Sequence, residues 1–173
     1  MSTLAISADQ IDHIRAHAAS TYPEECCGIL LGRLHREGEA ITRTVVDLWP
    51  VNNAWGDEAK MAIAPLSHNP DQSPELSPDQ NLTAERRYWI DPKELLAAQK
   101  VGRERDLQMI GIYHSHPDHP AVPSECDRVL AWPDYSYMIV SVPEGSATDV
   151  LSWALDEDQQ FQSEIVQISG SLF

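Results

Sequence analysis

Apolar positions along the chain alternate or cluster in seven short runs, and each run is typical of a β-strand. The predicted strands cover residues 27–32, 40–50, 86–90, 109–113, 137–142, 150–155 and 161–168. Gly32 is expected to end the first strand, and a turn at 34–38 then forms a hairpin with the second. The unbroken apolar run from Met109 to Tyr113 is typical of a strand covered on both faces.

An apolar period of three to four residues predicts three helices. They cover residues 7–19, 91–105 and 123–131. Ser7 is a suitable N-cap for the first helix. Pro92 lies in the first turn of the second, where proline is favoured. Strands and helices mixed in this way predict the α/β (α+β) class, with a central, largely antiparallel sheet.

A length of 173 residues allows one domain with its own core, so a single domain is expected over residues 1–173. The stretch at about 51–83 is the least regular part, because four prolines lie among polar residues there. It is predicted to be a long loop, and loops of this length are usually functional or disordered. A flap over an active site and a surface excursion are both compatible with this pattern.

The chain is strongly acidic, with 27 Asp and Glu against 12 Lys and Arg and a formal net charge of −15. This balance excludes a typical nucleic-acid-binding protein, which needs basic patches. The acidic surface has three interpretations: a face for a basic partner, an ordinary solvated surface, or adaptation to high salt. Unchanged folding between salt-free and molar-salt buffer would contradict the third.

No run of 18 apolar residues is present, so no membrane span is expected. The first ten residues lack the charged and apolar regions of a signal peptide. Three cysteines do not suggest a disulfide framework. These features together predict a cytoplasmic protein.

Two histidines and one carboxylate form a candidate metal site after the apolar run 109–113. His114 and His116 are two residues apart and therefore lie on one face of a strand. Pro117 favours an extended conformation at His116, which prolongs the strand through that residue. Asp127 follows in the first turn of the short helix. Two imidazoles and a carboxylate are three zinc ligands, which leaves one position open as catalytic sites require.

Other interpretations of these residues stay open. Ser124 and Asp127 have the spacing of a capping box, so Asp127 could simply start a helix. The same ligand set also suits iron or manganese. Cys26 and Cys27 could indicate a thiol protease, although a cysteine at the start of an apolar strand is typical of a small core residue.

The motif His114-x-His116-Pro117, followed by Ser124-x-x-Asp127, resembles the signature of the JAB/JAMM/MPN+ metalloprotease family. The family also has a glutamate three residues before a glycine near the N-terminus, and here Glu25 precedes Gly28 by three. The resemblance extends over nearly the whole chain.

The resemblance implies one Zn²⁺ per chain, bound by His114, His116 and Asp127. It also implies that Glu25 is the general base and that Ser124 helps stabilise an oxyanion. The implied fold is a mixed sheet flanked by helices, similar in outline to cytidine deaminases.

In its short, single-domain form the chain is similar to bacterial members that process small ubiquitin-like sulfur-carrier proteins with a Gly-Gly tail. The implied reaction is hydrolysis after the C-terminal glycine, either releasing cysteine from a carrier–cysteine adduct, a step of cysteine biosynthesis, or trimming the tail. Alternatives are an isopeptidase acting on a ubiquitin-like conjugate and a non-catalytic scaffold. A zinc deaminase is disfavoured, because the P-C-x-x-C motif is absent.

The remaining polar residues near the motif are expected to have supporting roles. Ser115 points away from the two histidines and is expected to be structural. Asp118 and His119 follow Pro117 and are expected to lie in a loop or to contact substrate. The other histidines are expected at the surface: His13, His17, His35 and His68.

Overall fold

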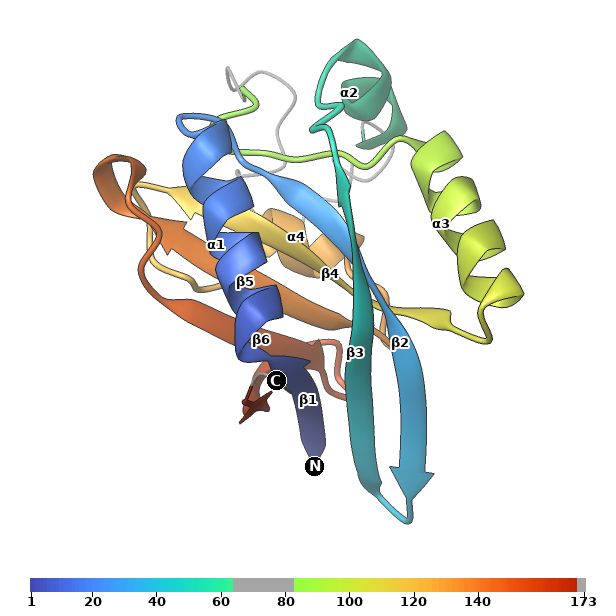
Figure 1. Cartoon of the computed structure of the whole chain (residues 1–173). Helices are drawn as coiled ribbons and strands as arrows, with labels where there is room; N and C mark the ends of the chain where they lie inside the picture. Colours follow the sequence, from blue (N-terminus) through green and yellow to red (C-terminus); the bar gives the residue numbers. More distant parts are fainter. Residues whose placement is uncertain (64–82, 171–173) are drawn as a thin grey trace.

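The computed structural model describes residues 1–63 and 83–170 of the chain (Figure 1). Its strands are β1 (Ser2–Ser7), β2 (Cys27–Glu37), β3 (Ala40–Val51), β4 (Gln108–Pro117), β5 (Ser136–Val142), β6 (Val150–Leu155) and β7 (Phe161–Ser169). Its helices are α1 (Ala8–Thr21), α2 (Asp57–Ile63), α3 (Pro92–Glu104), α4 (Glu125–Leu130) and the short 3₁₀ helix η3 (Pro143–Gly145). No helix in the described ranges has the length and apolar character needed to cross a membrane.

The strands form one mixed sheet that closes on itself in the order β1-β3-β2-β4-β5-β6-β7. Pairing is parallel between β1 and β3, β1 and β7, and β4 and β5, whereas the other neighbours are antiparallel. The predicted α+β class and mixed sheet are therefore confirmed. The closure of the sheet was not predicted, and the similarity in outline to cytidine deaminases stays a prediction.

Strand β1 closes the sheet, and it was not among the strands predicted from the sequence. The strand pairs in parallel with β3 on one side, where Leu4 lies opposite Arg43. It pairs in parallel with β7 on the other side, where Leu4 lies opposite Val166. Both edges of the sheet thereby gain a hydrogen-bonding partner, which removes the free edges of an open sheet. The strand has only six residues and runs directly into α1, which is why its pattern merges with that of the helix.

Helices α1 and α3 cover opposite faces of the sheet (Figure 1). Ile11, Ile14 and Ala18 of α1 pack against a core that includes Leu30 and Met138. On the other face, α3 packs against a second core. Both helices begin where the sequence predicts, because Ser7 and Asp91 accept hydrogen bonds from backbone amides of the first turn.

Strand β2 continues five residues beyond its predicted end at Gly32. The register against β3 shifts between Leu31 and Gly32. A Cβ atom at Gly32 would lie 2.0 Å from the carbonyl oxygen of Thr44 on β3. The glycine is therefore needed where two backbones approach closely inside a strand, and it does not mark a turn.

Two further stretches differ from expectation. Residues 86–90 run beside the sheet but join none of its ladders, so the predicted strand there is wrong. Within the predicted irregular stretch 51–83, residues Asp57–Ile63 form α2. Most of the predicted loop falls on residues 64–82, which lie outside the described residues. The predicted flap over an active site therefore also falls outside them.

A buried ion pair crosses the sheet between β3 and β7. Arg43 and Glu164 are 2% and 5% exposed, and their Nη1 and Oε1 atoms lie 3.1 Å apart. Glu164 also accepts hydrogen bonds from three serine hydroxyls on other strands: Ser2, Ser136 and Ser152. Five strands therefore share one satisfied polar cluster, as buried charges require.

Replacing Arg43 alone is expected to destabilise the fold strongly. The change Arg43→Met leaves Glu164 buried without its cation and should lower the free energy of unfolding by about 3–5 kcal/mol in urea titrations. Combining it with Glu164→Gln, which removes the uncompensated charge, should restore part of the loss. Arg36→Met is the control, since Arg36 and Asp134 form an exposed pair; its cost should stay below about 1 kcal/mol. Equal costs for Arg43→Met and Arg36→Met would contradict the importance of the buried pair.

Candidate metal centre

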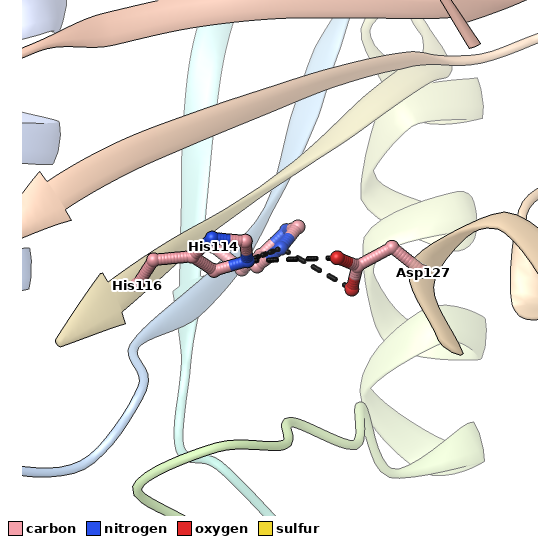
Figure 2. Close-up of side chains that lie close together, drawn as sticks. All are labelled: His114, His116 and Asp127. Carbon is pink, nitrogen blue, oxygen red and sulfur yellow. Dashed lines mark hydrogen bonds and ion pairs between the residues drawn. The ribbon is translucent and has the colours of Figure 1, made fainter. Parts of the chain in front are cut away.

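Strand β4 carries two histidines to one buried point. The strand runs to Pro117, so the predicted extended geometry through His116 is confirmed. His114 is fully buried and His116 is 8% exposed. Their Nε2 atoms lie 3.1 Å apart, and Figure 2 shows both rings close to Asp127. The period of two along a strand accounts for this convergence.

Helix α4 supplies the carboxylate that faces the two imidazoles (Figure 2). The Oδ1 atom of Asp127 lies 3.4 Å from Nε2 of His114, and Oδ2 lies 3.5 Å from Nε2 of His116. The backbone amide and the hydroxyl of Ser124 both donate to Oδ2 over 2.7 Å. The capping box is therefore present, and the same box aims Asp127 at the histidines.

The residues present fit a zinc ion. One ligand atom from each of His114, His116 and Asp127 can be chosen so that all three lie within 4.8 Å of one another. A tetrahedral zinc ion with bonds of ~2.0–2.1 Å needs ligand atoms roughly 3.3–3.4 Å apart. The two Nε2 atoms are 3.1 Å apart, and each lies 3.4 or 3.5 Å from one of the two oxygens of Asp127, so the separations lie close to that value.

The two imidazole rings are held from behind by different contacts. The Nδ1 atom of His116 lies 2.9 Å from the carbonyl oxygen of Pro120, so it carries the proton and leaves the Nε2 lone pair for a metal. The Nδ1 atom of His114 has no hydrogen-bond partner among the described residues. The His114 ring instead stacks on Tyr88, with centroids 4.5 Å apart and an angle of 25° between the planes.

The protonation states of the group suit metal binding. Burial lowers the pKa of His114, which favours the neutral imidazole. Burial alone would raise the pKa of Asp127, but His114 and His116 hold it well below its usual value. A neutral imidazole and an ionised carboxylate are the forms that bind a metal.

The pairing of β2 with β4 brings Glu25 to this group. Cys27 lies opposite His114 in the antiparallel ladder, and the amide of Ser115 donates to the carbonyl of Cys26 over 3.2 Å. Glu25 lies two residues before this ladder begins, and its carboxyl is close enough to Asp127 for the two charges to interact. Glu25 is 5% exposed, and burial raises the pKa of its carboxyl well above the usual value, with a further increase from Asp127. Arg87 opposes this shift and lowers the pKa.

The glycine of the Glu-x-x-Gly spacing has a packing role. A Cβ atom at Gly28 would lie 2.2 Å from the ring of Tyr113 on β4. The hydroxyl of Tyr113 lies 2.9 Å from Nδ1 of His17 on α1, and burial lowers the pKa of that histidine. His17 is half-buried, so it is less exposed than its expected surface position suggests. Gly28 lets the ring pass over β2, which supports the β2–β4 pairing.

The cysteines do not have the properties of thiol nucleophiles. Cys26, Cys27 and Cys126 are all buried. Burial raises the pKa of Cys26 to about 12 and also raises that of Cys27. Reactive cysteines need a lowered pKa, so the thiol-protease interpretation is disfavoured. The hydroxyl of Ser115 accepts a hydrogen bond from the amide of Cys26 over 2.8 Å, which confirms its structural role.

The two loop residues after Pro117 have separate partners. Asp118 accepts hydrogen bonds from the hydroxyl of Tyr22 and from the amide of Glu144, so it organises the loop. The Nε2 atom of His119 lies 3.0 Å from Nη2 of the exposed Arg86. Neither residue belongs to the metal-ligating group found in the described part of the chain.

Sequence reasoning missed three residues that contact this region, namely Asn53, Arg87 and Tyr88. Arg87 follows Arg86 in a chain with few basic residues, and this pair was the available signal. Tyr88 and Asn53 have no local pattern that distinguishes them from ordinary loop residues. Their contacts come from segments far apart in the sequence.

Comparisons with known proteins agree with the geometry. Residues 7–156 match a family described as prokaryotic homologs of the JAB domain. The chain is 32% identical over 161 residues to the desampylase of Haloferax volcanii. The matched region covers 90% of this chain and 91% of that protein. It is 28% identical over 153 residues to the CysO-cysteine peptidase of Mycobacterium tuberculosis. The matched region covers 88% of this chain and 82% of that protein. A solution structure of a protein from Desulfitobacterium hafniense superposes with a TM-score of 0.67 at 30% identity, covering 99% of this chain and 95% of that one.

Replacing a metal ligand is expected to abolish stoichiometric zinc binding. After removal of metal with a chelator and reloading, the native chain should bind one zinc ion, measured by plasma mass spectrometry. Loss of a hydrogen-bond partner that only supports a metal ligand lowers metal affinity by roughly 10–100-fold. His116→Ala removes the ligand itself and should lower the affinity for zinc by more than this. His119→Ala is the matched control and should keep full stoichiometry. Equal zinc content in both variants would contradict the assignment.

Proposed function

The chain belongs to the JAB-domain family, and from this premise we propose that it is a zinc-dependent metallopeptidase. The proposed reaction is hydrolysis of the bond after the C-terminal glycine of a small ubiquitin-like sulfur-carrier protein. The observation that carries the proposal is the convergence of His114, His116 and Asp127 beside the buried carboxyl of Glu25. The proposed unit is one JAB/MPN+ metalloprotease domain that acts in the cytoplasm.

His114, His116 and Asp127 would hold one zinc ion through two Nε2 atoms and a carboxylate oxygen. When bound, zinc supplies Lewis acidity, which activates water for attack and polarises a carbonyl group. The rings and the carboxylate are already oriented by Pro120, Tyr88 and Ser124. Preorientation of this kind lowers the cost of assembling the reactive geometry.

Glu25 is the proposed general base. Its raised pKa makes the carboxylate a stronger base than an exposed glutamate, so it can accept the proton of the attacking water. The protonated carboxyl can then donate that proton to the amine of the leaving group. Burial keeps competing water away from the carboxyl during both transfers.

Two roles are proposed for Ser124: orienting the carboxylate of Asp127 and stabilising an oxyanion. Its hydroxyl donates to Asp127 and so orients that carboxylate. The family resemblance also implies a role in stabilising the oxyanion of the tetrahedral intermediate. That second role requires the hydroxyl to turn from Oδ2 of Asp127 toward the substrate oxygen, and donors of this kind contribute ~2.7–4 kcal/mol to barrier lowering.

The names of the relatives support the substrate class. One is a desampylase and another a CysO-cysteine peptidase, and both are matched over most of their length. We propose cleavage of a carrier–cysteine adduct or trimming of a carrier tail, with an isopeptide conjugate as the alternative substrate. A purely non-catalytic scaffold is less well supported, because each proposed ligand and the base are present, and His114, His116 and Glu25 are buried.

Replacing the proposed base should remove turnover while leaving the metal in place. Glu25→Gln is expected to lower kcat by about 10²–10⁴-fold, since it removes proton transfer. The assay uses three substrates side by side: a Gly-Gly-ended carrier joined to cysteine, the same carrier with an extended tail, and a carrier–lysine isopeptide. Products are identified by mass spectrometry, and zinc content is measured for every variant.

The matched control is Glu24→Gln, at the exposed neighbouring position, which should retain native turnover. Zinc-loaded native protein that cleaves none of the three substrates would overturn the proposed function. Full activity of Glu25→Gln would overturn only the proposed role of Glu25 as general base, and the proposed function would remain.

A further inference from the structure

The side-chain amide of Asn53 binds the backbone beside the proposed base. Its Nδ2 group lies 3.1 Å from the carbonyl oxygen of Glu25 and 2.9 Å from that of Arg87. A third carbonyl, that of Ala84, lies 3.4 Å away. Both amide protons are therefore engaged, and they join Glu25 to a segment some sixty residues later in the chain.

The amide oxygen of Asn53 is equally occupied. It accepts hydrogen bonds from the backbone amides of Trp55 over 3.0 Å and Trp89 over 3.1 Å. An amide oxygen has two lone pairs, so its accepting capacity is used completely. The side chain thus contacts backbone groups on three separate stretches, which a residue serving only its own turn would not do.

Residues 83–90 depend on these contacts because they belong to no strand of the sheet. Two backbone hydrogen bonds also hold the segment: the amide of Glu25 donates to Ala84 over 2.8 Å, and the amide of Ala54 donates to Trp89 over 2.9 Å. Asn53 lies between these two bonds and supplies the donors and the acceptor that a neighbouring strand would otherwise provide.

The segment that Asn53 anchors touches the metal group and the base directly. Tyr88 stacks on His114, the ring whose Nδ1 has no hydrogen-bond partner among the described residues. Arg87 acts electrostatically on Glu25. Displacing the segment would therefore shift one ligand ring and alter the surroundings of the carboxyl, without removing any ligand.

We propose that Asn53 is a positioning residue of the metallopeptidase site. It fixes the backbone of Glu25 and the stacking of Tyr88 on His114 by joining residues 84–89 to the start of β2. This inference rests on the proposed function for its kinetic consequence. Its structural content, that the Asn53 donors hold the segment in place, is independent of the substrate.

The test uses Asn53→Asp, which keeps the accepting oxygen and removes the two donated protons. Asn52→Asp is the matched control, since Asn52 is the exposed neighbour and the charge change is identical. A misplacement of ~1 Å in an active site can cost about 10²-fold in rate. We therefore expect Asn53→Asp to lower kcat by about 10–100-fold, with KM changed less than about twofold and zinc content unchanged.

Three kinetic outcomes would overturn the inference. One is the same kcat and KM for Asn53→Asp and Asn52→Asp. Another is a loss of activity that zinc loss fully explains. The third is a lowered thermal midpoint with unchanged kcat, which is the result for a residue that only stabilises the fold. If Asn53→Asp does not fold, Asn53→Ser, which keeps a shorter donor and acceptor, is judged by the same criteria.

A second measurement separates this inference from the proposed function. Should the native protein cleave no carrier substrate, the proposed function fails, and amide hydrogen exchange followed by nuclear magnetic resonance tests Asn53 by itself. The amides of Glu25 and Ala54 should exchange at least about tenfold faster in Asn53→Asp than in Asn52→Asp, because the segment that protects them is loosened. Equal exchange rates in the two variants would overturn the inference.

Discussion

The antiparallel pairing of β2 with β4 is the constraint on which the site depends. Its register sets Cys27 opposite His114, and Glu25 precedes Cys27 by two residues. A slip of one residue would turn the side chains of one strand to the other face and separate the proposed base from the proposed ligands. Gly28 protects this register, because it leaves room for the ring of Tyr113.

The polar clusters around Glu164 and Asp127 differ in how completely their carboxylates are hydrogen-bonded. Around Glu164, one guanidinium and three hydroxyls satisfy the carboxylate, so the cluster is closed and structural. Around Asp127, two imidazole nitrogens face a carboxylate at 3.4 and 3.5 Å, beyond good hydrogen-bond distance. That spacing costs stability in a protein without metal and is the spacing that a cation needs. The difference separates a structural cluster from a candidate metal site.

The sequence by itself determined the parts of the site that arise within a few residues. Strand periodicity aligned His114 with His116, and Pro117 kept the chain extended. The capping box joined Ser124 to Asp127 through contacts three residues apart. Each feature follows from local backbone geometry, which a short window of sequence encodes almost completely.

Only the tertiary structure decided how these parts meet. The distance between Glu25 and the histidines along the chain is closed by strand pairing, and the sheet is closed by β1, whose pattern runs into a helix. Gly32 resembles a turn residue, yet its neighbour across the sheet requires a glycine inside a strand. Asn53 has no local signature, because all its partners but Trp55 are distant in sequence. Such contacts depend on which segments pack together, and that choice is made by the burial of the whole core.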